Sequence, residues 1–301
     1  MNYLTVNQAA LRWGIAEQTV RKYVTRGRIP TAILEDGRWL IPDDAEKPGM
    51  PSAKEFELSR LLKRILYEKA RNNHYGIYEY LQVNIAYSSS RMASNRITRV
   101  QVMDIYRTGK LCHNFEETKV DDIIETINHF AAAEHMIDSV AEPLSGSYIK
   151  NLHRLLIYGT EAERRHKVYP GAYRRDLIKK KTIPSVAPTK INKALITLIR
   201  EYEMEPATLE RILDFHVKFE RIHPFDDYNG RVGRLLMLKE CLRYGIDPFI
   251  LDDKRRSEYF QGIINWDTDP ALLTGTVQAA QVRLMNTLDT CKHMQYYRMP
   301  Y

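Results

Sequence analysis

One segment of the chain concentrates the side chains that could do chemistry. Residues 214–245 read DFHVKFERIHPFDDYNGRVGRLLMLKECLRYG, and two helical patterns flank a short break in this stretch. Pro224 should end the first helix, because proline removes a backbone donor and restricts its neighbour. His223 is therefore expected at a helix end, where an imidazole of near-neutral pKa can serve as a general base. The apolar positions that would bury the two helices are Ile212, Phe215, Phe219 and Ile222, then Leu235, Leu236, Leu238 and Leu242.

The second helix is expected to begin near Gly230, with Asn229 as its cap. Its free first-turn amides and helix dipole would favour an anion, and a glycine lets that anion come close. Together with Arg231 and Arg234 they predict a site for phosphates. Asp227 beside such a site indicates a bridging cation, and Mg²⁺ held by one carboxylate and by phosphate oxygens fits this role.

The stretch HPFDDYNGRVGR, residues 223–234, is similar to the signature of Fic proteins, HPFx(D/E)GNGRxxR. The resemblance continues through FERIHPF, GRVGRLLMLKECL, DPFILDD and the terminal QYYRMPY, so it covers nearly all of residues 55–301. It implies a protein adenylyltransferase that moves AMP from ATP to a hydroxyl of a Ser, Thr or Tyr in a target protein.

The resemblance also implies a role for each matching residue. His223 would deprotonate the target hydroxyl, which attacks the α-phosphate and expels pyrophosphate. Asp227 would hold Mg²⁺, and Phe225 would anchor the loop in the core. The implied phosphate ligands are Asn229, Gly230 and Arg231 for the α- and β-phosphates and Arg234 for the γ-phosphate.

The sequence departs from the family signature at Tyr228, where the family has glycine. A tyrosine is strained there if φ is positive, and its ring would lie near the nucleotide. Three outcomes are open: a tolerated ring that points outward, a changed donor nucleotide, or a damaged site. The first is favoured.

A second departure lies in YSSSRMASNRIT, residues 87–98, which resembles the family's inhibitory segment, (S/T)xxxE(G/N). Ser89 matches, but Ala93 stands where the inhibitory Glu belongs. In relatives that Glu pairs with the second arginine of the signature, so its loss would leave Arg234 open to ATP and the transferase constitutively active. The alternative is an amphipathic helix whose Ala93 packs against a neighbour.

Residues 164–188, RRHKVYPGAYRRDLIKKKTIPSVAP, carry no helical stripe and are expected to form a surface loop or hairpin. They occupy the place of the family's flap, which pairs with an extended segment of the target. The lysines at 179–181 either favour acidic targets or only solvate the loop, and the second reading is preferred.

Residues 1–48 are expected to form a separate module. Thr5 can cap a first helix, Gly14 breaks it, and a second helix carries the DNA-binding candidates Arg21, Lys22 and Arg26. The stretch RIPTAILEDGRWLIP would add a small wing. The module resembles the winged helix-turn-helix of excisionase and MerR-like proteins, which indicates DNA binding or, alternatively, protein docking.

Composition sets the remaining limits. The chain has 301 residues with 44% apolar content and a net charge of +7, which permits polyanion partners without establishing them. The three cysteines show no CxxC spacing, and no long apolar run appears, so we expect a cytoplasmic protein without a membrane partner.

The sequence thus predicts a mainly α protein. Its parts would be a winged helix-turn-helix at 1–48, a linker at 49–54 and a Fic-type helical bundle with a β-hairpin flap at 55–301. Two other functions stay open: transfer of another nucleotidyl, phosphoryl or phosphocholine group on the same fold, and DNA-binding regulation with a degenerate Fic domain. Homo-oligomerisation and self-modification are also open.

Overall fold

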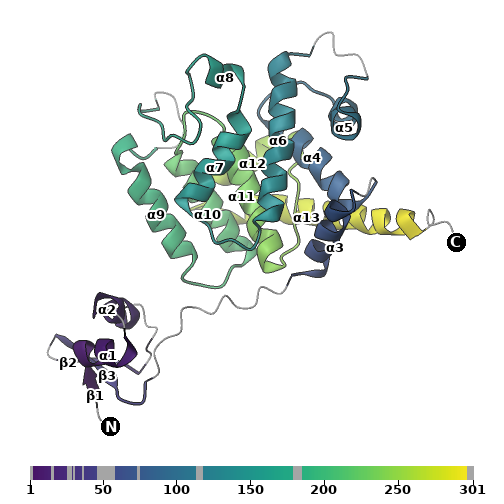
Figure 1. The fold of residues 1–301 in the computed structure, drawn as a ribbon. Coiled ribbons are helices and arrows are strands. Elements are labelled where there is room, and N and C mark those ends of the chain that lie inside the picture. The colour runs from purple at the N-terminus through teal and green to yellow at the C-terminus, as the bar shows by residue number, and fades with distance from the viewer. Residues whose placement is uncertain are drawn as a thin grey trace. The chain divides into compact units, whose positions relative to one another are not determined.

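The computed structural model describes residues 3–14, 17–25, 29, 31–35, 37–45, 58–72, 75–112, 118–178 and 185–296. The chain divides into two compact units, Met1–Glu57 and Leu58–Tyr301 (Figure 1). Within the described residues, none of the helices has both the length and the apolar character needed to cross a bilayer.

The N-terminal unit has two helices and a small sheet. Thr5 caps α1 (Val6–Trp13) through a reciprocal capping box with Gln8, and Gly14 ends that helix in the left-handed conformation. The second helix is α2 (Glu17–Thr25). The strands β1 (Tyr3–Thr5), β2 (Ile33–Glu35) and β3 (Arg38–Pro42) pair antiparallel in the order β1-β3-β2.

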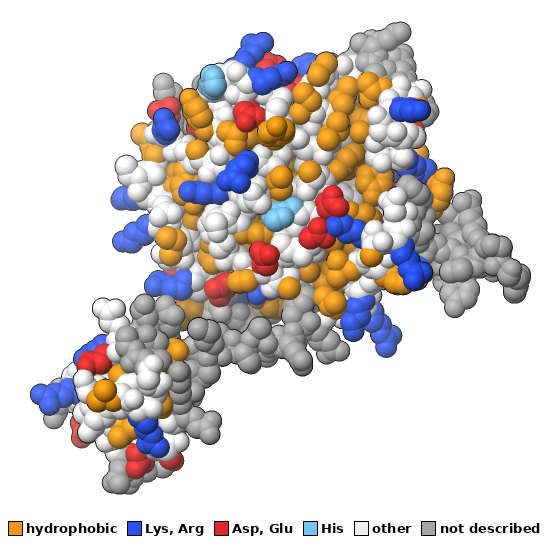
Figure 2. Space-filling model, viewed as in Figure 1, with side chains coloured by type: hydrophobic (Ala, Val, Ile, Leu, Met, Phe, Trp, Pro, Cys, Tyr) orange, Lys and Arg blue, Asp and Glu red, His pale blue; other side chains and the backbone are white. Residues whose placement is uncertain are grey.

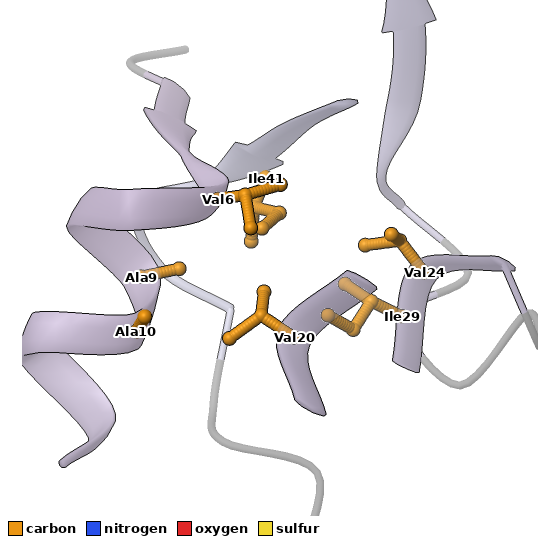
Figure 3. Packing of buried hydrophobic residues seen from close by; sticks show 7 residues of the cluster. All are labelled: Val6, Ala9, Ala10, Val20, Val24, Ile29 and Ile41. Carbon is orange, nitrogen blue, oxygen red and sulfur yellow. The ribbon is translucent and has the colours of Figure 1, made fainter. Parts of the chain in front are cut away.

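Small aliphatic side chains hold this unit together. The two helices and β3 meet over a shared core (Figure 3), which consists of Val6, Ala9, Ala10, Val20, Val24, Ile29 and Ile41. The expected helix-turn-helix with a β2–β3 wing is confirmed. The first strand, β1, was not predicted, because three residues are too few to show an alternating pattern.

In the described residues of the second unit, all regular secondary structure is helical. Its α-helices are α3 (Arg60–Ala70), α4 (Ile77–Met92), α5 (Arg99–Thr108), α6 (Val120–Asp138), α7 (Gly146–Ile157), α8 (Glu161–Arg164), α9 (Ile191–Tyr202), α10 (Leu209–Ile222), α11 (Asn229–Tyr244), α12 (Arg256–Ile264) and α13 (Pro270–Tyr296). Two 3₁₀ turns, η1 (Pro188–Lys190) and η2 (Asp253–Arg255), precede α9 and α12.

Helix α11 is the centre of the bundle. It packs against α10, α7, α6 and α4, and Figure 1 shows it enclosed by its neighbours. Leu235, Leu236, Leu238 and Leu242 are all buried, as the sequence predicts. Lys239 and Glu240 on the same helix are buried as well, so the helix is covered on every side. Its N-terminus is therefore fixed rigidly relative to the surrounding helices.

The apolar stripe of α6 is buried only in part, since Ile123 and Phe130 pack against a buried cluster but Ile127 does not. The sequence pattern suggests that Ile123, Ile124, Ile127 and Phe130 bury α6, yet Ile127 is 49% exposed. The buried face of α6 includes Asp122, Thr126 and His129 instead. Apolar residues, among them Ala132 and Met136, continue this face toward the end of the helix, so the buried polar residues lie in its first half.

Candidate active site

The end of α10 and the turn after it place His223. The helix stops at Ile222, and His223 follows with φ of 50° while its N–H still donates to the Phe219 carbonyl at 2.9 Å. Phe225 is completely buried and stacks on His153, with ring centroids 3.8 Å apart and planes within 5°. This buried stack anchors the turn, as the sequence suggests, and holds His223 half-buried at the protein surface.

Asn229 stabilises the turn in a different way from the one predicted. The N-cap of α11 is Tyr228, and Asn229 is already the first helical residue. The Asn229 side chain forms two hydrogen bonds with the Phe225 backbone, accepting from its N–H at 2.9 Å and donating to its carbonyl at 2.8 Å. Asn229 thus closes the loop between the two helices, and it is not the helix cap.

The N-terminus of α11 faces an open cavity. The first intrahelical hydrogen bond runs from Val232 N–H to Tyr228 O at 3.0 Å, so the amides of Asn229, Gly230 and Arg231 precede it. A Cβ at Gly230 would lie 2.9 Å from Arg234 Nη1, too close without a shift of the guanidinium. A glycine at this position therefore keeps backbone and arginine donors close together.

The cavity has a volume of about 330 Å³. Figure 2 shows this unit with a histidine side chain among acidic and basic side chains on the same face. The lining residues are Met92, Ala93, Glu220, His223, Asp227, Tyr228, Asn229, Gly230, Arg231, Arg234, Phe260, Ile263 and Ile264. The predicted base, carboxylate and both arginines thus border a single cavity, and an apolar wall from α12 completes it.

Asp227 is the exposed carboxylate of this cavity. Its Oδ1 accepts a hydrogen bond from the Tyr228 N–H at 2.6 Å, which engages one of its two oxygens. Among the described residues, no group of three or more His, Cys, Asp or Glu side chains could form a metal site of protein ligands alone. A cation here would depend on Asp227 and on oxygens of a bound ligand, which is the mode that suits Mg²⁺.

The other histidines near the site are poor candidates for a base. Burial, together with the charges of nearby arginines, lowers the pKa of His129 and of His216 to about 3. His216 Nε2 lies 2.6 Å from the hydroxyl of the buried Tyr259. Burial also lowers the pKa of His153 to about 4. These rings stay neutral inside the protein, whereas His223 borders the cavity.

Comparison with known proteins identifies the larger unit. Residues 143–241 match the model of the Fic/DOC family. The chain carries a Fic domain. Residues 3–45 match a helix-turn-helix domain model, in agreement with the structure of the N-terminal unit.

Curated relatives of the Fic domain match only in part. The protein adenylyltransferase fic-1 of Caenorhabditis briggsae is 34% identical over 82 residues, which are 26% of this chain and 16% of that protein. The protein adenylyltransferase Fic of Drosophila melanogaster is 47% identical over 45 residues, 15% of this chain and 9% of the relative. The matched segment is thus a small share of these relatives' length.

Solved structures share the fold over a much longer range. Fic-1 (residues 134–508) of C. elegans superimposes with a TM-score of 0.60 at 20% identity, covering 76% of this chain and 72% of that one. A Fic domain containing signaling protein of Bacteroides thetaiotaomicron gives a TM-score of 0.56 at 19% identity, covering 76% and 92%. At these identities the likeness shows the fold alone, and the predicted Fic-type bundle is confirmed.

Tyr228 of the Fic domain points inward, so the favoured expectation of an outward ring is wrong. Its φ is 64°, the left-handed region that favours the family's glycine. The side chain is only 4% exposed, and its hydroxyl donates to Glu125 Oε1 at 2.6 Å. The Arg231 guanidinium lies 4.2 Å from the ring centroid. Burial and these contacts offset the backbone strain, and the ring forms part of the cavity wall.

Tyr228→Gly is expected to destabilise the protein although it restores the family residue. Truncating a buried aromatic side chain costs about 3–5 kcal/mol, and release of left-handed strain returns about 1–2 kcal/mol. The free energy of unfolding should therefore fall by about 2 kcal/mol, measured by urea denaturation of the full chain. An unchanged or higher stability would show that the ring contributes little packing.

Arg231 of the Fic domain is paired with Glu125 from α6. Arg231 Nη1 lies 3.0 Å from Glu125 Oε1, and Arg231 Nη2 donates to Oε2 at 3.1 Å. Burial alone would raise the pKa of the Glu125 carboxyl, but the Arg231 charge and the hydrogen bonds it accepts hold that pKa below its usual value. Glu125 is therefore ionised at neutral pH. Its negative charge pairs with Arg231, the arginine that is predicted to bind phosphate.

Arg234 is held by the segment that resembles the family's inhibitory motif. Its Nε donates to Ser89 Oγ at 3.1 Å and its Nη2 to the Ser89 carbonyl at 3.0 Å. Ala93 is the exposed C-cap of α4 and borders the same cavity as Arg234, so the alternative in which Ala93 packs against a neighbour is wrong. Ser94 follows with φ of 71°, at the place of the family's Gly or Asn.

The loop at 164–188 is tied to the turn of the Fic signature by Arg174. This arginine is 2% exposed, and its Nε donates to the His223 carbonyl at 2.7 Å. Its Nη2 donates to the carbonyls of Val186 and Ile222, and its backbone N–H donates to Pro224 O at 2.9 Å. The described parts of this loop contain no strand, and the lysines at 179–181 lie outside the described residues.

The DNA-binding candidates belong to the other unit. Arg21 is exposed on α2, the second helix of the helix-turn-helix. The side chain of Lys22 and the whole of Arg26 lie outside the described residues.

Sequence reasoning missed two residues that shape the site, Glu125 and Arg174. Neither belongs to the signature, and each lies in a segment whose charged residues are indistinguishable from solvated ones in the sequence. For Glu125 the sequence pattern pointed the other way, because the predicted apolar stripe of its helix would leave Glu125 facing solvent.

Proposed function

We propose that the Fic domain transfers AMP from ATP to the hydroxyl of a Ser, Thr or Tyr side chain of a protein. The observation that carries this proposal is the cavity at the N-terminus of α11, where backbone amides, Arg231 and Arg234 lie with His223 and Asp227. Anion donors, a carboxylate and a histidine are the parts that nucleotidyl transfer requires. The names of the curated relatives point in the same direction.

In this proposal the phosphates lie along the start of α11. The first-turn amides and Arg231 bind the α- and β-phosphates, and Arg234 binds the γ-phosphate. The apolar wall of Phe260, Ile263 and Ile264 suits a flat nucleobase. Asp227 and phosphate oxygens would hold Mg²⁺, which supplies neutralisation of the charge that develops on the phosphates.

His223 then acts on the incoming hydroxyl. Its imidazole accepts the hydroxyl proton while the oxygen attacks the α-phosphorus. A new P–O bond forms to the target, the bond from the α-phosphorus to the bridging oxygen breaks, and pyrophosphate leaves with its electron pair. Fixed donors around the phosphates stabilise the charge that moves onto the leaving group. In this proposal the loop anchored by Arg174 next to His223 presents the target.

A label-transfer experiment tests the proposal. The full chain is incubated with Mg²⁺, with each nucleoside triphosphate labelled at the α- or the γ-phosphate, and with or without cell lysate. We expect α-label from ATP on protein, no γ-label, one pyrophosphate released per label, and loss of transfer when EDTA removes the metal. Transfer of γ-label, or of no label despite ATP binding, would refute AMP transfer and favour another transferred group. α-Label from another nucleotide would keep the mechanism and change the donor.

A further inference from the structure

Three side chains from two segments far apart in the sequence meet beside the cavity. Glu125 comes from the first half of α6, Tyr228 from the turn before α11, and Arg231 from the first turn of α11. Neither the signature nor the resemblance gives Glu125 a role. Its carboxylate nevertheless receives Arg231 through both oxygens, at 3.0 and 3.1 Å.

Glu125 lies outside the cavity that Arg231 borders. Tyr228 and Arg231 are among the lining residues and Glu125 is not. Its side chain is 12% exposed and that of Arg231 is 9% exposed. Arg231 thus borders the cavity and its carboxylate partner does not, so in this inference a phosphate approaches Arg231 from the side away from Glu125.

Two further contacts fix the carboxylate and the guanidinium. The Tyr228 hydroxyl donates to Glu125 Oε1 at 2.6 Å, and Asn95 Nδ2 donates to Oε2 at 3.1 Å. The Tyr228 ring also lies against the Arg231 guanidinium, 4.2 Å from it. A bidentate carboxylate and an aromatic face together leave the planar guanidinium little rotational freedom.

Asn95 connects Glu125 to the segment that also contacts Arg234. It belongs to residues 87–98, the same segment whose Ser89 holds Arg234. One segment thus supports both signature arginines, Arg234 directly and Arg231 through Glu125. The segment that lacks the family's inhibitory Glu contacts the site in a supporting role.

We propose that Glu125 is a positioning residue that holds Arg231 in place for the phosphates of the nucleotide, with Tyr228 as the second side of the clamp. The inference rests on the proposed function only in assigning a phosphate to Arg231. It concerns phosphate binding, and it holds whichever group is transferred.

The proposal is tested by whether Glu125→Gln raises or lowers the affinity for ATP. Glu125→Gln removes a negative charge near the site, so simple electrostatics predicts tighter binding of ATP. A clamp predicts the opposite, because the amide nitrogen of Gln would face one Nη donor of Arg231 and release the guanidinium. We expect the affinity for ATP·Mg, measured by calorimetry on the full chain, to fall about tenfold or more. The affinity for adenosine, which has no phosphate, should not change.

Tyr228→Phe removes only the hydroxyl and keeps the ring. We expect a smaller loss of ATP affinity in the same direction. Because the hydroxyl acts through Glu125, the double variant with Glu125→Gln should lose less affinity than the product of the two single losses. Tyr148→Phe removes the hydroxyl of another buried tyrosine, which accepts a hydrogen bond from Ser139, and should leave ATP binding unchanged.

Glu79→Gln is the matched control for loss of a buried ion pair. Glu79 is 5% exposed on α4 and accepts from Arg107 Nε at 2.8 Å, away from the cavity. Both Gln variants should lower the melting temperature, because each leaves an arginine without its carboxylate. Only Glu125→Gln should change the ratio of ATP to adenosine affinity.

The outcomes separate this inference from the proposed function. Tighter ATP binding by Glu125→Gln would mean that Glu125 competes with phosphate, and an equal loss for ATP and adenosine would mean a general structural role. Either result overturns the inference whether or not AMP is transferred. A wild-type chain that binds ATP without transferring AMP overturns only the proposed function, and one that binds no nucleotide overturns both.

Discussion

Replacement of His223 by alanine is expected to slow label transfer by ~10²–10⁴-fold, the usual contribution of a positioned general base. ATP binding should persist, because the proposed phosphate donors are the amides of α11, Arg231 and Arg234, which this change leaves in place. The measurement is the rate of α-label incorporation at saturating ATP, with ATP affinity determined separately by calorimetry.

His135→Ala is a suitable control for this experiment. His135 lies in the last turn of α6, where its Nε2 is 3.0 Å from the Asn151 amide nitrogen, and it does not border the cavity. Its loss should leave the transfer rate unchanged. Full activity of His223→Ala, or a loss of ATP binding as large as the loss of rate, would contradict the role of His223 as base.

Ala93→Glu is expected to lower the rate of label transfer from ATP. Ala93 borders the same cavity as Arg234, one helical turn after Ser89, which already holds that arginine. A Glu side chain there can pair with the guanidinium and occupy the place of the γ-phosphate. Such a charge-assisted pair is worth about 1.5–3 kcal/mol, so transfer at limiting ATP should fall about 10–100-fold.

Ala93→Gln separates charge from bulk in that experiment. Glutamine has the same shape and no charge, so it should reduce transfer far less than glutamate. Equal effects of the two substitutions would assign the loss to steric blocking of the cavity. Undiminished transfer by Ala93→Glu would show that the alanine at this position is not what leaves Arg234 open to ATP.

The sequence alone predicts the two helices of the signature well, since their apolar spacing and Pro224 are strong local signals. Helix α10 ends at Ile222 and α11 begins at Asn229, within a residue of the expected positions. The turn between them was harder to predict. Asn229 serves the loop instead of the cap, because two hydrogen bonds to Phe225 outweigh a single one to the helix amides.

The surroundings of the signature could not be predicted, because they depend on contacts between residues far apart in the sequence. Tyr228 turns inward only because Glu125, some hundred positions earlier in the chain, supplies an acceptor for its hydroxyl. Such a contact leaves no trace in local periodicity. The buried face of α6 was predicted only in part, because an apolar pattern favours Ile127, which is exposed, and misses the buried polar residues Asp122, Thr126 and His129.

The anchoring of the 164–188 loop by Arg174 has a consequence for how new targets can arise. Arg174 binds carbonyls on both sides of the loop and those of Ile222 and His223, so the base of the loop and the catalytic turn form one rigid piece. Under the proposed function, in which this loop presents the target, substitutions farther out along the loop would alter which protein is bound while the distance between a presented hydroxyl and His223 is preserved. Target choice and chemistry can therefore evolve independently in this domain, with Arg174 as the fixed point between them.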